Sequence, residues 1–372
     1  MKCVLISENI KRALSFVERS TGKDLTLPIL SSVLIQVDGG SIKIMGTNLE
    51  IGTESTIRGT VQDQGKVAIP ARALSSFIAT IPKDEKITFE SQKNDLIIQT
   101  QSQKTIIKGY PHEDFPPFPL IKELYRISFK KADLLPILQK SLICVSKNSI
   151  KPELASVSIS FEKDIGYIAA TDSFRLSEEH IKPTLLSPKI AKESILIPAR
   201  TCEELIKLLE SENSDTVDLF ISKGEILIQY AETRLYSRLT EGKFPDYQQI
   251  IPKSFKTTIS VNRSVFVNHL KQASIFSNKL SGVSFTFSSG KQEITIESSN
   301  RDIGEYKASF KSVIQGEDLT VVFNYHYLMD GLNAFSVEDL YFGFNNESQP
   351  LLIYPTKKSD SLYLVMPMKG GV

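Results

Sequence analysis

The sequence is poor in the residues and motifs that support chemistry. Its 372 residues include three cysteines, Cys3, Cys144 and Cys202, which are scattered and odd in number, so neither a disulfide framework nor a metal knuckle is indicated. The four histidines form no HxxxH or HExxH pair. The chain also lacks a GxSxG elbow, a GxxxxGKS/T phosphate loop, a CxxC pair and an EF-hand carboxylate ladder. We therefore expect no enzyme activity, no cofactor and no metal.

Long apolar runs are also missing. No stretch approaches the length of a membrane span, and the first residues carry charges throughout instead of an apolar signal core, so we expect a cytoplasmic protein. The composition is that of an ordinary globular protein, with 41% hydrophobic and 23% charged residues and a net charge of +1. This balance does not exclude a polyanionic partner, because binding depends on how charge is distributed over the surface.

What the sequence does contain is a repeat. The stretch from Leu154 to Leu176 alternates apolar and polar residues, turns at Lys163-Asp164, returns, and ends in a mixed polar loop, which predicts a hairpin with one buried face. A similar pattern begins at Leu30, with a turn at Gly39-Gly40, and another begins at Leu280. The three leading leucines lie 124 and 126 positions apart, close to one third of the chain.

Other landmarks keep the same period. Ile69-Pro70-Ala71-Arg72 returns as Ile197-Pro198-Ala199-Arg200, and Phe115-Pro116 returns as Phe244-Pro245. Three domains of common ancestry follow, since each third has an ordinary domain size. We place them at residues 1–122, 123–253 and 254–372.

Each domain is predicted to contain a strand, a helix and three strands, repeated twice. The result is an α+β fold in which two helices back mostly antiparallel sheets. In the first domain we expect a helix capped by Ser7 and a third strand from Gly52 to Thr60. The six predicted helices are Ser7 to Glu18, Ala71 to Ile81, Lys131 to Val145, Thr201 to Glu210, Arg263 to Ser277 and Tyr325 to Leu332.

Three features are candidates for function. Asp172 beside Arg175 is either an active pair or a loop ion pair, and the second is favoured because such pairs are common. Lysines and arginines recur on the helices, Lys140 among them, and are either solvated surface residues or a stripe that fits a duplex phosphate backbone without choosing a sequence. The methionines of Val365-Met366-Pro367-Met368 suit an apolar groove for a peptide, although a last core strand is the alternative.

These motifs together give the chain a close resemblance to the bacterial DNA polymerase III beta subunit, or sliding clamp, family. The similarity runs from end to end of the chain, in the order that the family shows. The motifs that carry it are Thr26-Leu27-Pro28-Ile29-Leu30, Gly46-Thr47-Asn48-Leu49-Glu50, Ile69-Pro70-Ala71-Arg72, Ala170-Thr171-Asp172-Ser173-Phe174-Arg175-Leu176, Gly242-Lys243-Phe244-Pro245-Asp246-Tyr247 and Val365-Met366-Pro367-Met368.

The resemblance implies a processivity factor for DNA replication and DNA repair. Each chain would be half of a closed ring, and a head-to-tail homodimer would encircle double-stranded DNA with its helices facing inward. Thr105 and Ile107 of one chain would meet Ile275 and Phe276 of the other. A repeat protein with open sheet edges needs such a partner, which supports the dimer independently.

The resemblance also implies a peptide-binding cleft between the second and third domains, for short linear motifs of the polymerase III alpha subunit, the clamp loader, other polymerases and repair factors. Ser173-Phe174 departs from the glycine-histidine pair usual in the family. The residues carried over to this cleft are Leu154, Thr171, Ser173, Phe174, Arg175, Leu176, Pro245, Ile250, Asn324, Tyr327, Val365, Met366, Pro367 and Met368.

DNA contacts are expected from cations of the helices and neighbouring loops, with no choice of sequence and no membrane contact. Asp24 stands where the family commonly has an arginine, which weakens the contribution of the first domain. The expected DNA-binding residues are Lys23, Arg72, Lys147, Asn148, Lys151, Arg200 and Lys243. The alternative functions are a three-domain repeat scaffold without a clamp role and an enzyme with an unrecognised site.

Overall fold

The structure is a computed structural model that describes residues 1–22, 27–118, 125–148, 150–187, 194–355 and 360–369. The chain forms two compact units. Unit 1 contains Met1–Leu135, Pro183–Ala191 and Arg200–Thr240, and unit 2 contains Pro136–Lys182, Lys192–Ala199 and Glu241–Val372. Predicted Lys23 and Asp24 lie outside the described residues.

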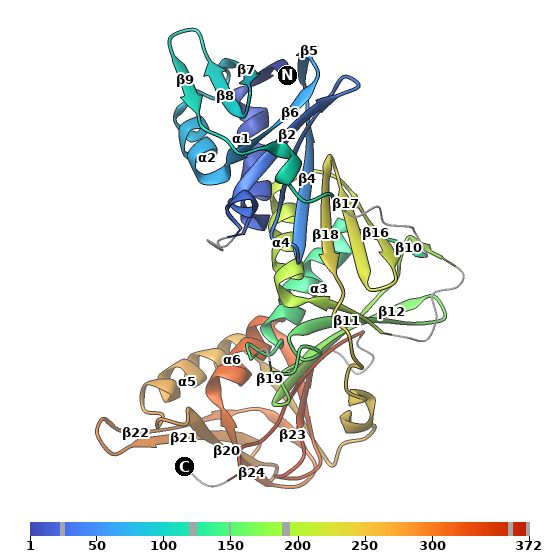
Figure 1. Ribbon diagram of the computed structural model, residues 1–372. Coiled ribbons are helices and arrows are strands. Elements are labelled where there is room, and N and C mark those ends of the chain that lie inside the picture. Colours follow the sequence, from blue (N-terminus) through green and yellow to red (C-terminus); the bar gives the residue numbers. More distant parts are fainter. Residues whose placement is uncertain (23–26, 119–124, 149, 188–193, 356–359, 370–372) are drawn as a thin grey trace. The chain divides into compact units, whose positions relative to one another are not determined.

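Unit 1 contains a five-stranded antiparallel sheet in the order β5-β1-β7-β8-β9. Its strands are β1 (Lys2–Ile6), β5 (Gly59–Asp63), β7 (Lys86–Gln92), β8 (Asp95–Gln99) and β9 (Lys104–Ile107). Helices α1 (Ser7–Val17) and α2 (Ala71–Thr80) lie side by side in Figure 1. Their apolar faces, including Ile10, Leu14 and Leu74, join the buried core of the unit.

A nine-stranded antiparallel sheet completes unit 1, in the order β14-β10-β16-β17-β18-β4-β3-β2-β6. Its strands are β2 (Ser32–Asp38), β3 (Ser41–Thr47), β4 (Ile51–Ile57), β6 (Gly65–Pro70), β10 (Tyr125–Lys130), β14 (Leu185–Leu186), β16 (Thr216–Ser222), β17 (Glu225–Tyr230) and β18 (Thr233–Arg238). The pairing of β4 with β18 joins strands of the predicted first and second domains, and we call it the first seam.

Unit 2 has a second nine-stranded antiparallel sheet, ordered β15-β11-β12-β13-β27-β26-β25-β19-β23. Its strands are β11 (Ser156–Glu162), β12 (Ile165–Thr171), β13 (Arg175–Ile181), β15 (Ile195–Pro198), β19 (Thr257–Asn262), β23 (Val313–Gln315), β25 (Asp339–Phe344), β26 (Leu351–Tyr354) and β27 (Ser361–Val365). Here β13 pairs with β27, and we call this pairing the second seam.

A four-stranded sheet, β22-β21-β20-β24, also belongs to unit 2. Its strands are β20 (Gly282–Ser288), β21 (Glu293–Asn300), β22 (Gly304–Lys311) and β24 (Leu319–Asn324). Helices α5 (Arg263–Ile275) and α6 (Tyr325–Asn333) lie together beside it in Figure 1. Phe266, Phe285 and Phe342 form an aromatic core in this part of the unit. The rings of Phe266 and Phe342 pack edge to face, with their centres 5.1 Å apart.

The remaining helices are α3 (Lys131–Ile143) and α4 (Ala199–Ser211), with short 3₁₀ helices η1 (Glu18–Ser20), η2 (Pro28–Ser31), η3 (His112–Asp114) and η4 (Tyr247–Ile250). The predicted α+β fold with antiparallel sheets is confirmed, and so are the hairpin turns at Gly39-Gly40 and Lys163-Asp164. The two units divide the predicted second domain, because each nine-stranded sheet continues across a predicted domain boundary.

Two local predictions were wrong. Ser7 does not cap α1: Ile6 is the N-cap residue, and the buried Ser7 hydroxyl has no hydrogen-bond partner among the described residues. The strand predicted from Gly52 to Thr60 is two strands, because the chain leaves the nine-stranded sheet after Ile57 and pairs with β1 as β5. Apolar alternation predicts a strand, but it does not show that the strand changes sheets.

Candidate functional site

The loop between β12 and β13 keeps its shape through side-chain hydrogen bonds. The Thr171 hydroxyl donates to the carbonyl of Arg175 at 2.7 Å and accepts from the N–H of Ser173 at 3.1 Å. The Asp172 Oδ1 atom accepts from the N–H groups of Phe174 and Arg175 at 2.9 and 3.0 Å. Ser173 takes a left-handed conformation with φ 78°. The loop is therefore a tight turn closed by its own side chains.

Arg175 is tied down by the residues around it. Its Nε donates to Asp172 Oδ2 at 2.9 Å and its Nη1 to Asp330 Oδ2 at 2.5 Å, and its guanidinium lies 4.6 Å from the centre of the Tyr327 ring. Burial acts to lower the pKa of Arg175, but Tyr363 and the two aspartates outweigh it and raise the pKa. The interpretation of Asp172 and Arg175 as a loop ion pair is confirmed.

A mainly apolar cavity of about 150 Å³ opens beside this loop at the second seam. Leu176 and Leu364, which are paired across the seam, form part of its wall, and Tyr247 enters from η4. Burial raises the pKa of Tyr247, and the nearby Glu178 carboxylate raises it further, so the phenol stays neutral. The predicted cleft residues that line this cavity are Thr171, Ser173, Phe174, Arg175, Leu176, Pro245, Ile250 and Met366.

The other predicted cleft residues are not among those that line the cavity. Leu154 and Val365 are buried in the fold. Asn324 caps α6 by accepting from the N–H of His326 at 2.9 Å. Tyr327 stacks against Phe174, with ring centres 6.2 Å apart. Pro367 and Met368 follow β27, and the N–H of Met368 donates to the carbonyl of Val322 at 2.8 Å.

Three lining residues were missed by the sequence analysis, namely Asp246, Tyr247 and Leu364. Asp246 and Tyr247 follow Pro245 directly, and the short η4 helix holds the Tyr247 ring against Phe244, with ring centres 5.8 Å apart. Both residues belong to the Gly242 to Tyr247 motif, and this membership could have identified them as cleft residues. Leu364 is 1% exposed, so nearly all of its side chain belongs to the core.

Five of the seven predicted DNA-binding residues are exposed cations. Arg72 on α2, Arg200 on α4, Lys147 and Lys151 on the loop after α3, and Lys243 are all exposed. Within the described part of the chain, no ion pair involves any of these five residues. Asn148 lies on the loop of Lys147, where its Oδ1 accepts from the N–H of Ile150 at 3.1 Å.

Several other helix cations do not form the expected stripe. Lys140 was predicted on it, but its side chain is 7% exposed and forms an ion pair of 2.5 Å with Glu179. Arg12 pairs with Glu212 at 3.2 Å, and Lys207 pairs with Glu204 at 2.7 Å. Helical position alone does not tell a buried lysine from an exposed one. The charge available to a polyanion is therefore smaller than a count of helix cations suggests.

The predicted dimer residues lie at two sheet edges. Thr105 and Ile107 belong to β9, the last strand of its sheet, and are half-buried. Ile275 ends α5 and is 62% exposed, whereas Phe276 stacks on Tyr306 of the edge strand β22 with ring centres 6.3 Å apart. Ile106 of β9 and Ile303, which precedes β22, are exposed as well.

The chemistry of the cysteines agrees with a structural role. All three are buried, and burial raises the pKa of Cys3 to about 11 and the pKa values of Cys144 and Cys202 to about 12. Such thiols are poor nucleophiles at neutral pH. Among the residues described, no group of three or more His, Cys, Asp or Glu side chains is placed to hold a metal ion. Nor does any described helix have the length and apolar character needed to cross a membrane.

Three repeated α+β modules joined through shared sheets define a clamp fold. Family models of the DNA polymerase III beta subunit match its N-terminal domain at residues 1–119, its central domain at 128–246 and its C-terminal domain at 248–369. The chain belongs to the DNA polymerase III beta subunit family.

Relatives and solved structures agree over the full length. The chain is 28% identical to the beta sliding clamp of Synechocystis sp., and the match covers 99% of both chains. It is 24% identical to the beta sliding clamp of Bacillus subtilis, over 99% of this chain and 100% of the relative. A crystal structure of the Pseudomonas aeruginosa DnaN sliding clamp bound to griselimycin matches 99% of both chains with a TM-score of 0.93 and 23% identity.

Proposed function

We propose that this protein is a sliding clamp whose two copies close head to tail into a ring around duplex DNA. The observation that carries this proposal is the number of strands in the sheets. Each seam joins a group of five strands to a group of four, which gives two nine-stranded sheets per chain. The sheets that remain have five strands, ending at β9, and four strands, ending at β22.

The two free edges match each other in strand order. At both seams the last strand of one repeat, β18 or β27, pairs with the fourth strand of the repeat before it, β4 or β13. Strand β9 is the last strand of the first repeat, and β22 is the fourth strand of the last repeat. Pairing β9 with β22 of a second copy would complete the missing nine-stranded sheet and leave neither edge open.

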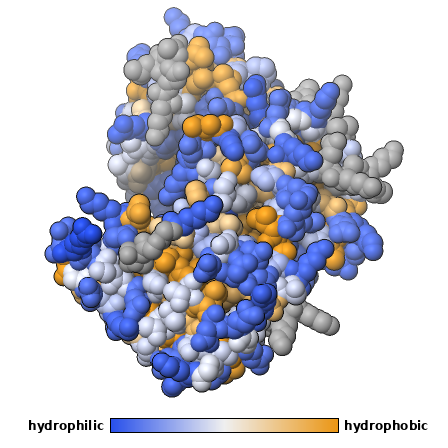
Figure 2. Space-filling view, turned by 90° about the horizontal axis from the view of Figure 1, so that it is seen from below, coloured by the Kyte–Doolittle hydropathy of each residue, from blue (hydrophilic) through white to orange (hydrophobic). Residues whose placement is uncertain are grey.

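Surface apolar residues support this choice of edges. Figure 2 shows small, separated hydrophobic patches among hydrophilic residues on the face that it draws, so no large patch there marks an interface. Ile106, Ile275 and Ile303, in contrast, are 53%, 62% and 61% exposed and lie at or next to β9 and β22. A pairing of these edges would bury all three.

The ring is tested by its oligomeric state. Ile106→Asp and Ile275→Asp each place a charge at a proposed edge without touching a buried core. We expect sedimentation to show a dimer for the parent chain and a monomer for either variant at the same micromolar concentration. Ile150→Asp is the matched control, because Ile150 is 81% exposed and belongs to neither edge. A monomeric parent, or dimers in both edge variants, would contradict the proposed interface.

DNA contact is assigned to the exposed cations Arg72, Arg200, Lys147, Lys151 and Lys243, with Asn148 and Lys23. Phosphate contacts of this kind carry no sequence preference. Arg200→Ala should reduce the slope of log affinity against log salt by about one. Lys207→Ala, on the same helix, is the control, because Lys207 already pairs with Glu204 and should leave the slope unchanged.

The cavity at the second seam is proposed as the cleft for short linear motifs of polymerases, the clamp loader and repair factors. Its apolar wall would accept leucine or phenylalanine side chains. Met366→Ala should weaken binding of such a peptide about tenfold without unfolding the chain. A scaffold without a clamp role would keep all its activities in this variant. The proposed role requires no catalytic residue and no cofactor, and it places the protein in the cytoplasm with the DNA.

The domain boundaries 1–122, 123–253 and 254–372 are part of this proposal. The ranges matched by the three family models support them, since each model falls almost wholly within one of these segments.

A further inference from the structure

Unit 1 contains a second copy of the loop that borders the cleft. The Thr47 hydroxyl donates to the carbonyl of Ile51 at 2.9 Å and accepts from the N–H of Leu49 at 3.0 Å. The Asn48 Oδ1 atom accepts from the N–H groups of Glu50 and Ile51 at 3.1 and 2.8 Å. Leu49 has φ 74°, beside φ 78° at Ser173 in the cleft loop. The two loops therefore share one hydrogen-bonding pattern.

The strands that follow the loops also correspond. Ile51 pairs with Ser237 across the first seam as Arg175 pairs with Val365 across the second. One position further along the chain, the N–H of Arg238 donates to the carbonyl of Glu50 at 3.2 Å, as the N–H of Met366 donates to the carbonyl of Phe174 at 2.8 Å. Arg238 therefore stands where the cleft has Met366.

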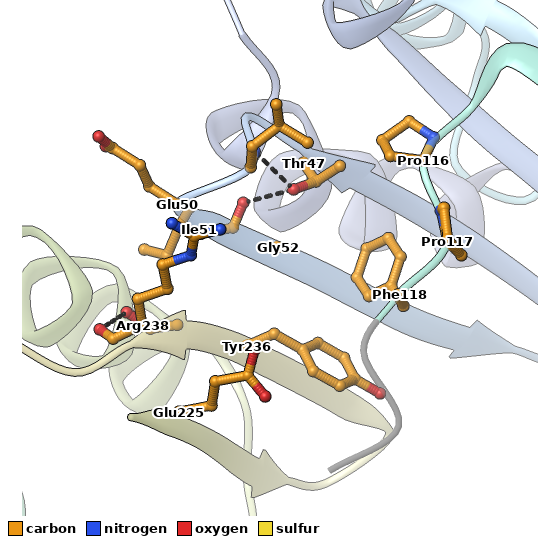
Figure 3. A pocket seen from close by; sticks show the side chains of 12 residues that line it. Thr47, Glu50, Ile51, Gly52, Pro116, Pro117, Phe118, Glu225, Tyr236 and Arg238 are labelled. Atoms are coloured by element: carbon orange, nitrogen blue, oxygen red, sulfur yellow. Dashed lines mark hydrogen bonds between the residues drawn. The ribbon is translucent and has the colours of Figure 1, made fainter. Parts of the chain in front are cut away.

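A cavity of about 270 Å³ lies at this position, compared with about 150 Å³ in the cleft (Figure 3). Phe118 and Tyr236 both line it, and their rings pack edge to face with centres 5.0 Å apart. Gly52 pairs with Tyr236 across the first seam, and a Cβ atom on Gly52 would come within 2.9 Å of the Phe118 ring. Glycine at the position of Leu176 therefore makes room for the ring, and the larger cavity admits a larger apolar side chain.

The charge at the rim differs from that of the cleft. Arg238 is exposed, and its side chain takes part in no ion pair within the described residues, whereas Arg234 on the same strand pairs with Glu54 at 3.5 Å. Glu225 is the register partner of Arg238, but the two side chains extend in different directions in Figure 3. Glu50 is also exposed at the rim. The Arg238 guanidinium is thus available to one carboxylate of a ligand. Glu50 and Glu225 disfavour a second ligand carboxylate, because they carry the same negative charge.

We propose that this cavity at the first seam is a second docking site, which takes an extended peptide with one large apolar side chain next to one carboxylate. The apolar side chain would lie against Phe118, Tyr236 and Ile51, and the carboxylate would pair with Arg238. The inference rests on the proposed role of the cleft, since the shared loop and register transfer that role to the first seam. A partner with two such segments would bind each chain at two points and gain avidity.

The absence of tryptophan from the chain allows each site to be followed alone. Phe118→Trp places the only indole in the first-seam cavity, and Tyr247→Trp places it in the cleft. The probe is an acetylated, amidated peptide of the order serine-glutamate-leucine-phenylalanine-serine, and a peptide with lysine for glutamate is its control. We expect the acidic peptide to shift the emission of both reporters, and the lysine peptide to bind the Phe118→Trp protein about tenfold more weakly.

Further variants separate the two sites. Arg238→Glu should weaken the Phe118→Trp response about tenfold, while Arg58→Glu, the same charge change at an exposed arginine outside the cavity, should leave it unchanged. Met366→Ala should affect only the Tyr247→Trp response. Calorimetry on the chain without a reporter should give two peptide sites per chain, and circular dichroism checks the fold of each variant.

The outcomes also distinguish this inference from the proposed function. A silent Phe118→Trp reporter at a peptide concentration that saturates Tyr247→Trp, with one calorimetric site, would overturn the second site and leave the cleft intact. A response of Phe118→Trp alone would support the second site and contradict the cleft. Silence of both reporters, with no heat of binding, would overturn both.

Discussion

The two seams share a backbone and differ in side chains. At each seam a threonine and an Asx residue close the loop with the same set of hydrogen bonds. The first residue after the loop is Ile51 at the first seam and Arg175 at the second. Three positions earlier, the Asx residue of the loop is Asn48 at the first seam and Asp172 at the second. The neutral amide accompanies the apolar residue, and the carboxylate accompanies the cation.

This difference shows how one repeat produces two surfaces. Asn48 and Asp172 serve the backbone equally, because both offer a side-chain oxygen to two N–H groups. Only Asp172 also balances a buried guanidinium, which no neutral residue does. The hydrogen bonds set the shape of the loop, while the charge of the Asx residue depends on its neighbour. Substitutions at the two seams test whether the hydrogen bonds and the charge of the Asx residue contribute separately.

The largest expected effect comes from the Asx residue. Asp172→Ala removes two backbone hydrogen bonds and one partner of a buried arginine, and we expect the free energy of unfolding to fall by about 3 kcal/mol. Asn48→Ala removes only the backbone bonds and should cost about 1–2 kcal/mol. Urea unfolding gives both values, and hydrogen exchange in β13 and β4 locates them.

Asp172→Asn is the decisive control, because it keeps the backbone acceptor and removes only the charge. We expect its stability to lie between those of the parent chain and Asp172→Ala. Equal losses for Asp172→Ala and Asn48→Ala would show that the ion pair adds nothing, and the proposed difference between the seams would be wrong.

A smaller effect of opposite sign is expected at the left-handed residues. Ser173→Gly and Leu49→Gly should each stabilise the chain by about 0.5–1 kcal/mol, because glycine adopts a positive φ without steric cost. Ser160→Gly, on the extended strand β11, should destabilise it by a similar amount. Thermal and urea unfolding measure the stability of all three variants. Destabilisation by both loop variants would show that the positive φ of Ser173 and Leu49 carries no steric cost that glycine relieves.

An effect of similar size is expected in unit 2 alone, and it depends on pH. A hydrogen bond to Glu178 at 3.2 Å raises the pKa of His180, with help from Asp360 at 3.5 Å. Because the folded chain favours the charged imidazole, this stabilisation is complete below about pH 6.5 and is lost as the pH rises through the raised pKa.

The corresponding residue of β4 is Thr56, which does not titrate in this range. His180→Thr should therefore remove about 0.5–1 kcal/mol of the difference in unfolding free energy between pH 6 and pH 8. The same difference in the variant and the parent chain would mean that His180 does not contribute.

Local pattern and spacing predicted much of this molecule. The period of the leucines and of the Ile-Pro-Ala-Arg motif gave three repeats, and alternation gave the hairpins. The pairing of β4 with β18 could not be predicted, because the two strands are far apart in sequence and the residues of one strand do not indicate which strand it pairs with. Without that pairing, the first-seam cavity could not be seen in the sequence.

Parts of the cleft escaped prediction for similar reasons. A helical pattern placed Lys140 among surface cations, although its ion pair with Glu179 lies in the interior. Tyr247 reaches the cavity only because a short 3₁₀ helix turns the chain after Asp246. Arg175 lines the cavity as predicted, but Asp172 and Asp330 already occupy two of its donors. Each case depends on contacts between distant residues, which periodicity does not encode.

The central claim is that two chains close around DNA, and retention on DNA tests it most directly. The protein would be loaded onto a nicked circular duplex, the excess removed, and half of the sample cut once with a restriction enzyme. We predict long retention on the circle and rapid loss from the linear form, because a ring leaves by sliding off an end. Equal rates of loss from both forms would contradict encirclement.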